Sequence, residues 1–328
     1  MGNKEHLRHI ETIRAIAALM VLSFHFVNYN NGSQFFIESK SIRTSFTFGA
    51  QGVELFYLIS GFIIPYSLLK GGYKIKHFFL YISKRIIRLY PPYLLTIVGI
   101  LVANLIFNEF IWETKAHIGI KQILANVFFL TDLFPNIEWI NPIFRTLKVE
   151  FQFYLLIGIL FPFLIQNRFN LILGCFALLG TGILLIGSNN VFTNAPFFVT
   201  GLILFLIFQN QWKWEYIIIL LISQLILLQF YYWEDLIINL IGIILIIGLP
   251  KESRFLQLTG KISYPIYLIH GLFGGWFLYA ASKFESGNNY PFIAIILAAL
   301  ISWGAAWIMH FLIEKPSMRW SRKIQYKN

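Results

Sequence analysis

The sequence predicts an all-α fold, a polytopic transmembrane helical bundle of about ten spans, and three observations support it. Of the 328 residues, 57% are hydrophobic and 12% are charged, whereas a soluble domain has about 25% charged residues. The mean hydropathy is +0.67. Apolar segments of about 20 residues, the length that crosses a bilayer, recur along the chain. We therefore expect residues 1–328 to form a single integral-membrane domain with no fused soluble domain.

Charge and cysteine content narrow the class of protein further. The net charge is +11, but no basic arm or domain stands apart from apolar sequence, so we expect membrane lipids and no nucleic acid as partners. The single cysteine, Cys175, lies in an apolar run and excludes both an internal disulfide and a cysteine-rich zinc site. The histidines lack an evident set of co-ligands, so no metal site is expected.

Ten segments are long and apolar enough to cross a membrane, with an error of several residues at each boundary. They are residues 10–28, 48–69, 91–108, 146–166, 169–187, 191–209, 214–231, 233–249, 262–282 and 292–314. The first follows a basic N-terminus, as the apolar core of a signal peptide does, but no convincing cleavage site is evident. We expect it to be retained as the first helix.

Two connecting segments have distinct patterns. Residues 72–90 alternate basic with aromatic and aliphatic side chains, which indicates an amphipathic helix at the membrane surface. We expect that helix to end at Pro91 and Pro92, because proline lacks the amide hydrogen that a helix interior needs. Residues 109–145 form the longest connection, and one short helix is predicted there near residues 121–131.

The distribution of basic residues predicts the orientation in the membrane. Ten spans place both termini on one side. If that side is cytoplasmic, 18 of the 26 lysines and arginines lie in cytoplasmic segments, and cytoplasmic loops of membrane proteins carry such an excess. We therefore predict cytoplasmic termini and a multi-pass protein of the cytoplasmic (inner) membrane.

Arg14 and His25 are ionisable groups inside the first predicted span. Their separation is about three helical turns, or ~16 Å along the axis, so they lie on one stripe with Arg14 nearer the cytoplasm. Such a stripe suits a long substrate whose anionic head binds Arg14 and whose reactive end reaches His25. The alternative is that Arg14 extends to lipid phosphates and that His25 is a hydrogen-bonded core residue.

Arg85 and Arg88 form an i, i+3 pair on one face of the predicted surface helix. The topology places them near Arg14 at the cytoplasmic end. Guanidinium groups match phosphate oxygens bidentately, so the three arginines are candidates to bind a phosphorylated donor. The alternative is that Arg85 and Arg88 bind lipid headgroups.

Two acidic residues, Glu54 and Glu150, lie at the outer ends of the second and fourth predicted spans. A carboxylate there could orient an imidazole or bind a hydroxyl-bearing acceptor. Either residue could instead be an interfacial acid paired with Arg145 or Lys148. The sequence leaves both interpretations open.

Ser263, Tyr267 and His270 recur at i, i+4 and i+7 and so form a polar stripe on one helix. The stripe could support a binding site. It could also supply the helix-to-helix hydrogen bonds that are ordinary in membrane bundles.

Six short segments, in order along the chain, resemble the acyltransferase 3 family of bacterial integral-membrane O-acyltransferases. They are Arg14 with His25, GVELFYLISGF at 52–62, KRIIRLYPPY at 84–93, TLKVEFQFY at 146–154, ISYPIYLIH at 262–270 and IEKP at 313–316. The resemblance covers residues 6–316. Two positions depart from the family pattern, because Glu54 stands where Asp is frequent and Arg145 stands where many members have Trp.

The resemblance implies transfer of an acyl group, expected to be acetyl, from cytoplasmic acyl-CoA to a hydroxyl of a cell-surface or lipid-linked glycan. Acetyl-CoA would be a co-substrate, with no permanently bound cofactor. The expected catalytic residues are His25 and Glu150, and the expected donor-binding residues are Arg14, Arg85 and Arg88. Histidine suits the deprotonation of an alcohol because its pKa is near neutral. Sequence does not separate a general base from a transiently acylated histidine.

The acceptor is expected at the outer mouth of the bundle. Trp112 and Trp139 offer flat faces for sugar rings, and Asp132 and Glu138 could accept hydroxyl hydrogen bonds. Both tryptophans could instead belong to an interfacial aromatic belt. Glu54, Ser263, Tyr267 and His270 complete the set of candidate acceptor or supporting residues. The competing function is a transporter of a lipid-linked sugar or acyl-group substrate, which would be expected to show an inverted repeat, and none is evident.

Overall fold

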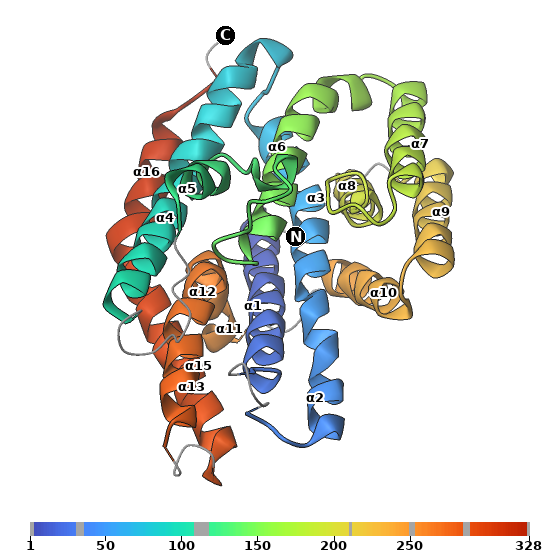
Figure 1. The fold of residues 1–328 in the computed structure, drawn as a ribbon. Coiled ribbons are helices and arrows are strands. Elements are labelled where there is room, and N and C mark those ends of the chain that lie inside the picture. Colours follow the sequence, from blue (N-terminus) through green and yellow to red (C-terminus); the bar gives the residue numbers. More distant parts are fainter. Residues whose placement is uncertain are drawn as a thin grey trace.

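A computed structural model describes residues 3–30, 36–107, 118–209, 212–248, 253–284 and 289–326. Within these ranges the regular secondary structure is helical and no strand is assigned, so the predicted all-α class is confirmed (Figure 1). The predicted short helix near 121–131 is present as α5 (Ile120–Val127).

The helices form three groups in Figure 1. The centre holds α1 (Asn3–Val27), α3 (Gly52–Lys70) and α6 (Phe144–Leu164). One side holds α7 (Arg168–Leu184), α8 (Ala195–Phe208), α9 (Trp214–Phe230) and α10 (Trp233–Gly248). The other side holds α4 (Phe78–Phe107), α11 (Arg254–Lys261), α12 (Ser263–His270), α13 (Trp276–Ser282), α15 (Pro291–Met309) and α16 (Lys315–Lys323). A short helix, α2 (Lys40–Thr47), precedes α3.

Several helices are long and apolar enough to cross a membrane, which makes this a multi-pass membrane protein. Five such helical stretches are found in the described residues: His9–Val27, Lys40–Lys70, Ile75–Leu105, Phe144–Leu164 and Pro291–Lys323. The predicted spans from 169 to 249 form α7 to α10, whose lengths are 17, 14, 17 and 16 residues. These are short for a hydrocarbon core of about 30 Å, so the count of ten spans stays a prediction.

The expectation that a surface helix ends at Pro91 is wrong. Helix α4 continues from Phe78 to Phe107 with both prolines inside it. The two prolines leave the carbonyls of Ile87 and Arg88 without their usual donors in the helix, which neighbouring helices make tolerable within a membrane bundle. The Tyr264 hydroxyl, which donates to the nearby Leu89 carbonyl at 2.8 Å, ties this part of α4 to α12. The basic segment and the third predicted span are therefore one helix. It carries Arg85, which is 8% exposed, into the bundle and not onto its surface.

Glycines bring the central helix α3 against α8. A Cβ added to Gly61 would lie 2.3 Å from the Phe198 carbonyl oxygen, and one added to Gly201 would lie 2.1 Å from that of Leu58. No side chain fits at either position, so the two backbones are in direct contact, as small residues allow in membrane bundles. Nearly every residue of α8 is buried, which explains why its sequence is apolar on all sides.

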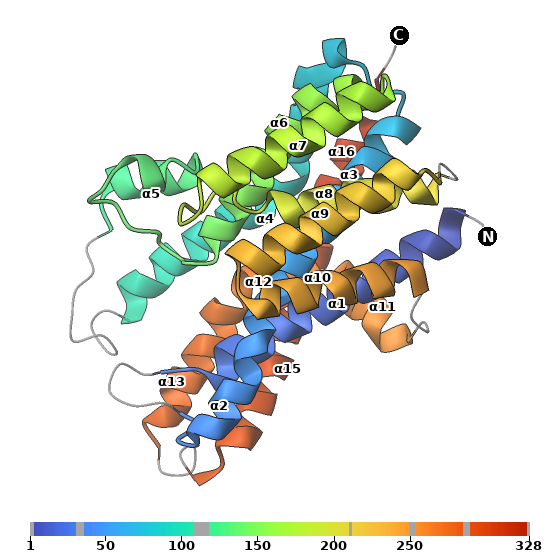
Figure 2. The same ribbon diagram turned by 90° about the vertical axis from the view of Figure 1, so that its right-hand side faces the viewer.

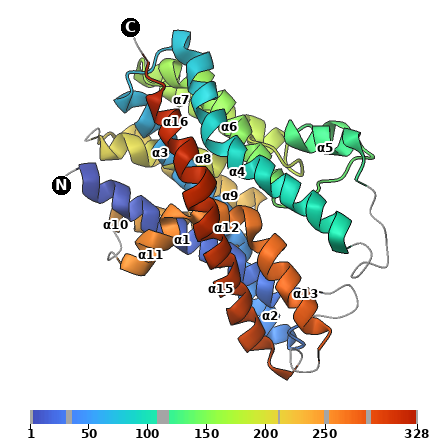
Figure 3. The ribbon, with the colours of Figure 1, turned by 90° about the vertical axis from the view of Figure 1, so that its left-hand side faces the viewer.

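Both ends of the described chain lie toward one end of the bundle. The beginning of α1 and the end of α16 are at the same end in Figure 2, and α2 and α13 are at the other. Figure 3 shows α15 and α16 in line as one long helix. A π-helical turn, His310–Glu314, joins them. A second π-helical turn, Gly271–Gly275, joins α12 to α13 and interrupts the predicted span at 262–282.

Candidate active site

A cavity of about 460 Å³ lies between α1, α3, α4, α6, α12 and the π-helical turn before α16. Its charged lining residues are Arg14, Lys70, Arg85, Arg88, Glu150 and Glu314. Its uncharged polar lining residues are Tyr57, Ser60, Tyr66, Ser67, Thr146, Tyr154, Ser263, Tyr264 and Tyr267. Six of the residues predicted from sequence therefore meet in one place: Arg14, Arg85, Arg88, Glu150, Ser263 and Tyr267.

Three arginines and Lys70 give this cavity its basic lining. Arg14 comes from α1, and Arg85 and Arg88 come from successive turns of α4. The guanidinium carbon of Arg85 lies 5.4 Å from the ring centroids of both Tyr81 and Tyr154, and its Nε has no hydrogen-bond partner in the described residues. None of the three arginines forms an ion pair with a described residue. Buried charges are normally paired, so the buried Arg85, with the half-buried Arg14 and Arg88 beside it, can bind an anion in the cavity.

Glu150 faces the arginines from α6. Its Oε1 accepts hydrogen bonds from the Ser60 hydroxyl at 3.1 Å and from the Tyr154 hydroxyl. The alternative that Glu150 pairs with Lys148 does not hold, because the Lys148 ammonium binds Asp132. The carboxylate of Glu150 is therefore fixed in the cavity wall by two neutral donors.

Glu314 is a cavity residue that the sequence analysis did not single out, although it lies inside the IEKP segment. Its side chain is nearly inaccessible, and its Oε2 accepts a hydrogen bond from Nδ1 of His310 at 2.5 Å. Both residues belong to the π-helical turn, which widens the helix at this point. A negative charge thus stands opposite the three arginines in the same cavity.

Two hydroxyl groups of the cavity lining bind each other. Tyr267 on α12 and Thr146 on α6 are hydrogen-bonded to each other there, and the Phe56 ring packs 5.8 Å from that of Tyr267. Ser263, one turn earlier on α12, is buried with an unpartnered hydroxyl among the described residues. Two members of the predicted polar stripe therefore line the cavity.

His25 and His270 lie near Tyr267 but are not part of the cavity lining. Their ring centroids are 4.9 Å apart, and the His270 ring is 6.3 Å from that of Tyr267. His25 is exposed, whereas His270 is buried. Arg14 lines the cavity and His25 does not, so the two residues of the predicted stripe do not share this cavity.

The tautomer of His25 follows from its hydrogen bond. Nδ1 lies 2.8 Å from the Val21 carbonyl oxygen, which can only accept, so Nδ1 carries the hydrogen. The lone pair of the imidazole is therefore on Nε2. This arrangement leaves one basic nitrogen free to take a proton from a hydroxyl.

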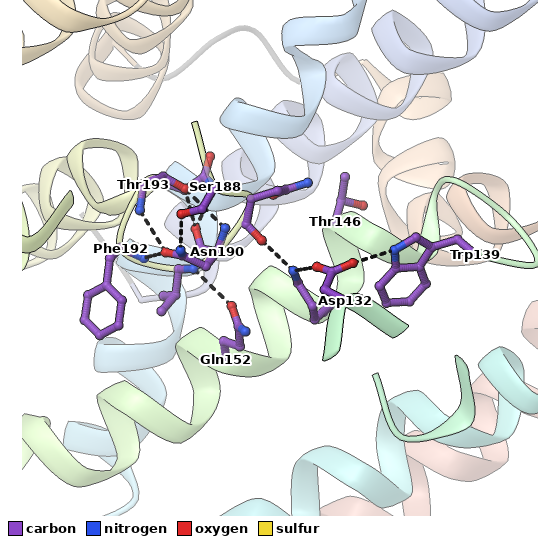
Figure 4. A network of polar contacts seen from close by, with 12 residues as sticks. Asp132, Trp139, Thr146, Gln152, Ser188, Asn190, Phe192 and Thr193 are labelled. Carbon is purple, nitrogen blue, oxygen red and sulfur yellow. Dashed lines mark hydrogen bonds and ion pairs between the residues drawn. The ribbon is translucent and has the colours of Figure 1, made fainter. Parts of the chain in front are cut away.

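Glu54 and Trp139, two further candidates, lie outside the cavity. The Gln51 amide, oriented so that both its atoms are satisfied, donates to Glu54 at 2.9 Å and to Asp235 at 3.1 Å. The Trp139 Nε1 donates to Asp132 Oδ1 at 3.0 Å (Figure 4). The Trp139 side chain packs against the hydrophobic core. Trp112 lies outside the described residues.

Asp132 holds an outer polar network together and accepts hydrogen bonds from Lys148 and Trp139. Its carboxylate binds the Lys148 ammonium, which also donates to the Asn189 carbonyl at 2.5 Å. Partial burial raises the pKa of Asp132, but the hydrogen bonds from Lys148 and Trp139 and the charges of Lys148 and Arg145 outweigh it and lower that pKa. The network joins the loop before α6, which holds Asp132, to the loop after α7, which holds Asn189.

This geometry can bind an anionic molecule at one end and deprotonate a hydroxyl at the other. The family model for an acyltransferase domain matches residues 7–310 of the chain. Comparison with curated proteins and with solved structures gave no significant match.

Proposed function

The chain belongs to the acyltransferase 3 family, and we propose that it transfers an acetyl group from cytoplasmic acetyl-CoA to a hydroxyl of a cell-surface or lipid-linked glycan. Membership of the family supports acyl transfer at a membrane in general. The cavity supports the choice of donor. The exposed position of His25 supports an acceptor that approaches from the other side.

The observation that carries this proposal is the convergence of Arg14, Arg85 and Arg88 on one cavity, without ion-pair partners in the described part of the chain. A coenzyme A thioester has phosphates at one end and a long uncharged arm that ends in the reactive carbonyl. Guanidinium groups would bind the phosphates bidentately. The arm would extend along α3 and α6 toward Tyr267, which lines the cavity.

The orientation in the membrane follows from the distribution of basic residues. We propose ten crossings, cytoplasmic termini and insertion in the cytoplasmic (inner) membrane. The arginine end of the cavity then faces the cytoplasm, where acyl-CoA is available. The histidines lie toward the outer face, where a glycan acceptor would be found.

In the proposed reaction, Nε2 of His25 removes the proton of the acceptor hydroxyl as the hydroxyl oxygen attacks the thioester carbon. The carbon–sulfur bond breaks, and the thiolate takes the proton from the imidazolium. The products are the acyl ester and free coenzyme A. The thioester would have to extend past the hydroxyl pair of Tyr267 and Thr146 to reach His25, because His25 does not line the cavity. Glu150, held by Ser60 and Tyr154, would orient the donor beside that pair.

Exchange of Arg85 and Arg88 for lysine tests donor binding. The double variant Arg85→Lys, Arg88→Lys keeps the charge but removes the planar fork. We expect affinity for coenzyme A, measured by calorimetry, to fall about tenfold or more, because two charge-assisted contacts are weakened. Arg254→Lys is the matched control, since Arg254 is exposed and lies outside the cavity.

The KM for the acceptor distinguishes a specific loss of donor binding from a general loss of folding. The apparent KM for a glycan acceptor from a cell-envelope extract should stay unchanged in the double lysine variant at saturating acetyl-CoA. Unaltered coenzyme A binding in that variant would instead assign both arginines to lipid headgroups and contradict the proposed donor site.

A further inference from the structure

His270 is a buried imidazole with one unused nitrogen. The residue is 1% exposed. Its Nδ1 lies 2.9 Å from the Tyr267 carbonyl oxygen and 3.1 Å from that of Ile266, so Nδ1 carries the hydrogen and donates it. Nε2 is therefore a bare acceptor, and no hydrogen bond reaches it from the described residues.

The backbone around His270 fixes the ring in place. The π-helical turn Gly271–Gly275 begins directly after it, and such turns occur frequently at functional sites. A Cβ on Gly274 would lie 2.2 Å from the Phe26 ring, so this part of the chain packs tightly against α1. The Phe26 ring itself lies 6.1 Å from that of His270. The unpartnered nitrogen is thus held rigidly and not left in a loose side chain.

His25 presents the same tautomer next to it. The Nδ1 of each imidazole donates to a backbone carbonyl, that of Val21 for His25, and each has its lone pair on Nε2. The two ring centroids are 4.9 Å apart with an angle of 54° between the ring planes. Two neighbouring neutral imidazoles in these tautomers have two Nε2 acceptors and no Nε2 hydrogen. One additional proton on either Nε2 would supply the missing donor.

We propose that His270 is a positioning residue for His25, whose Nε2 accepts the hydrogen bond that His25 can donate only after it has taken a proton. The inference rests on the proposed function, because the proton comes from the acceptor hydroxyl. In the described structure no carboxylate contacts His25. The acidic partner of the catalytic histidine in many hydrolases binds Nδ1–H, and in His25 that position is held by the Val21 carbonyl, so His270 would act on the protonated Nε2.

The step balances in protons and bonds. The acceptor hydroxyl gives its proton to Nε2 of His25 while its oxygen bonds to the thioester carbon. The imidazolium of His25 then donates from Nδ1 to the Val21 carbonyl and from Nε2 to His270. When the carbon–sulfur bond breaks, the thiolate takes the proton from Nε2. Both imidazoles return to the neutral tautomers that the structure shows.

Two substitutions separate the two nitrogens of His270. His270→Asn places an amide where Nδ1 lies, so it keeps the donor to the backbone but has nothing at the Nε2 position. His270→Gln places its amide oxygen near the Nε2 position, so it keeps an acceptor for His25. Both variants are purified as full chains and assayed with radiolabelled acetyl-CoA and a cell-envelope extract, and their thermal midpoints are measured.

We expect kcat of His270→Asn to fall about tenfold or more, a part of the 10²–10⁴-fold that a positioned base contributes. The KM values for both substrates should stay unchanged, and His270→Gln should recover most of kcat. In the His25→Ala background, His270→Asn should cause no further loss, because the two residues act as one unit.

Three results would overturn the proposal: wild-type kcat in the Asn variant, equal activity of the Asn and Gln variants, or a loss of kcat that follows a loss of thermal midpoint in both. The last would assign His270 to packing alone. Failure of the proposed function is distinguishable, because the wild-type protein itself would then transfer no acetyl group.

Discussion

Arg85 and Lys148 are both buried cations, but their surroundings give them different roles. The Lys148 ammonium binds the Asp132 carboxylate and the Asn189 carbonyl. The Arg85 guanidinium lies over the rings of two tyrosines and forms no ion pair with a carboxylate of the described residues. Cation–π contacts stabilise a charge while leaving its hydrogen-bond donors in plane free. Lys148 is therefore a structural residue, and Arg85 is available to a ligand.

The Lys148 pair gives a test of this difference at the level of single residues. Asp132→Asn leaves the ammonium buried without its counter-charge and should destabilise the protein by about 1–3 kcal/mol. Lys148→Met removes the buried charge together with its need for a partner, so its cost should be smaller, about 1 kcal/mol or less. Unfolding free energies of the two purified variants give the comparison. Equal or reversed costs would contradict a buried, desolvated ammonium.

The pH dependence of this contribution follows from the lowered pKa of Asp132. A carboxyl group whose pKa is lower in the folded protein contributes stability above its ordinary value of 3.8. The contribution disappears as the pH falls through the folded value. The wild type should therefore exceed Asp132→Asn in thermal midpoint at pH 7, and the difference should shrink below about pH 4. A difference that is constant from pH 7 to pH 3 would exclude the ionised carboxylate as its source.

At the scale of elements, close contact between α3 and α8 depends on glycine. Gly61→Ala and Gly201→Ala should each destabilise the protein by about 1–3 kcal/mol, because the added Cβ would displace a backbone. Gly180→Ala is the matched control. Gly180 lies inside α7 with nothing near its Cβ position, so alanine there should stabilise by about 0.5–1 kcal/mol. If the thermal midpoint falls in all three variants, the close contact between α3 and α8 is not the cause of the lost stability.

Sequence patterns predict the helices better than their junctions. Hydropathy places α6, α7 and α9 within a few residues, because apolar length alone defines them. It fails at Pro91, because the helices that pack against α4 there, such as α12 with Tyr264 bound to the Leu89 carbonyl, are far away in the chain. It also does not show the π-helical turns, because local composition does not encode a widened turn. Glu314, which lines the cavity, lies in one of these π-helical turns.

At the scale of the whole molecule, the three arginines line one cavity and the two histidines lie together outside its lining. Arg14, Arg85 and Arg88 were predictable as neighbours, since topology and guanidinium chemistry place them together. The hydrogen bond between Tyr267 and Thr146 was not, because it joins side chains of α12 and α6 that meet only in three dimensions. The pairing of His25 with His270 was unpredictable for the same reason. In the proposed function the arginines serve the donor and the histidines serve the acceptor.

Transfer across a sealed membrane tests this account most directly. Inverted membrane vesicles containing the protein expose the cytoplasmic face to the medium, and the glycan acceptor is enclosed in the lumen. Radiolabelled acetyl-CoA added outside should label the enclosed glycan, and His25→Ala should reduce the rate to less than about a tenth. Labelling that requires acetyl-CoA in the lumen, or that persists at the wild-type rate in His25→Ala, would contradict the proposed passage of an acetyl group from the arginine cavity to the histidine side.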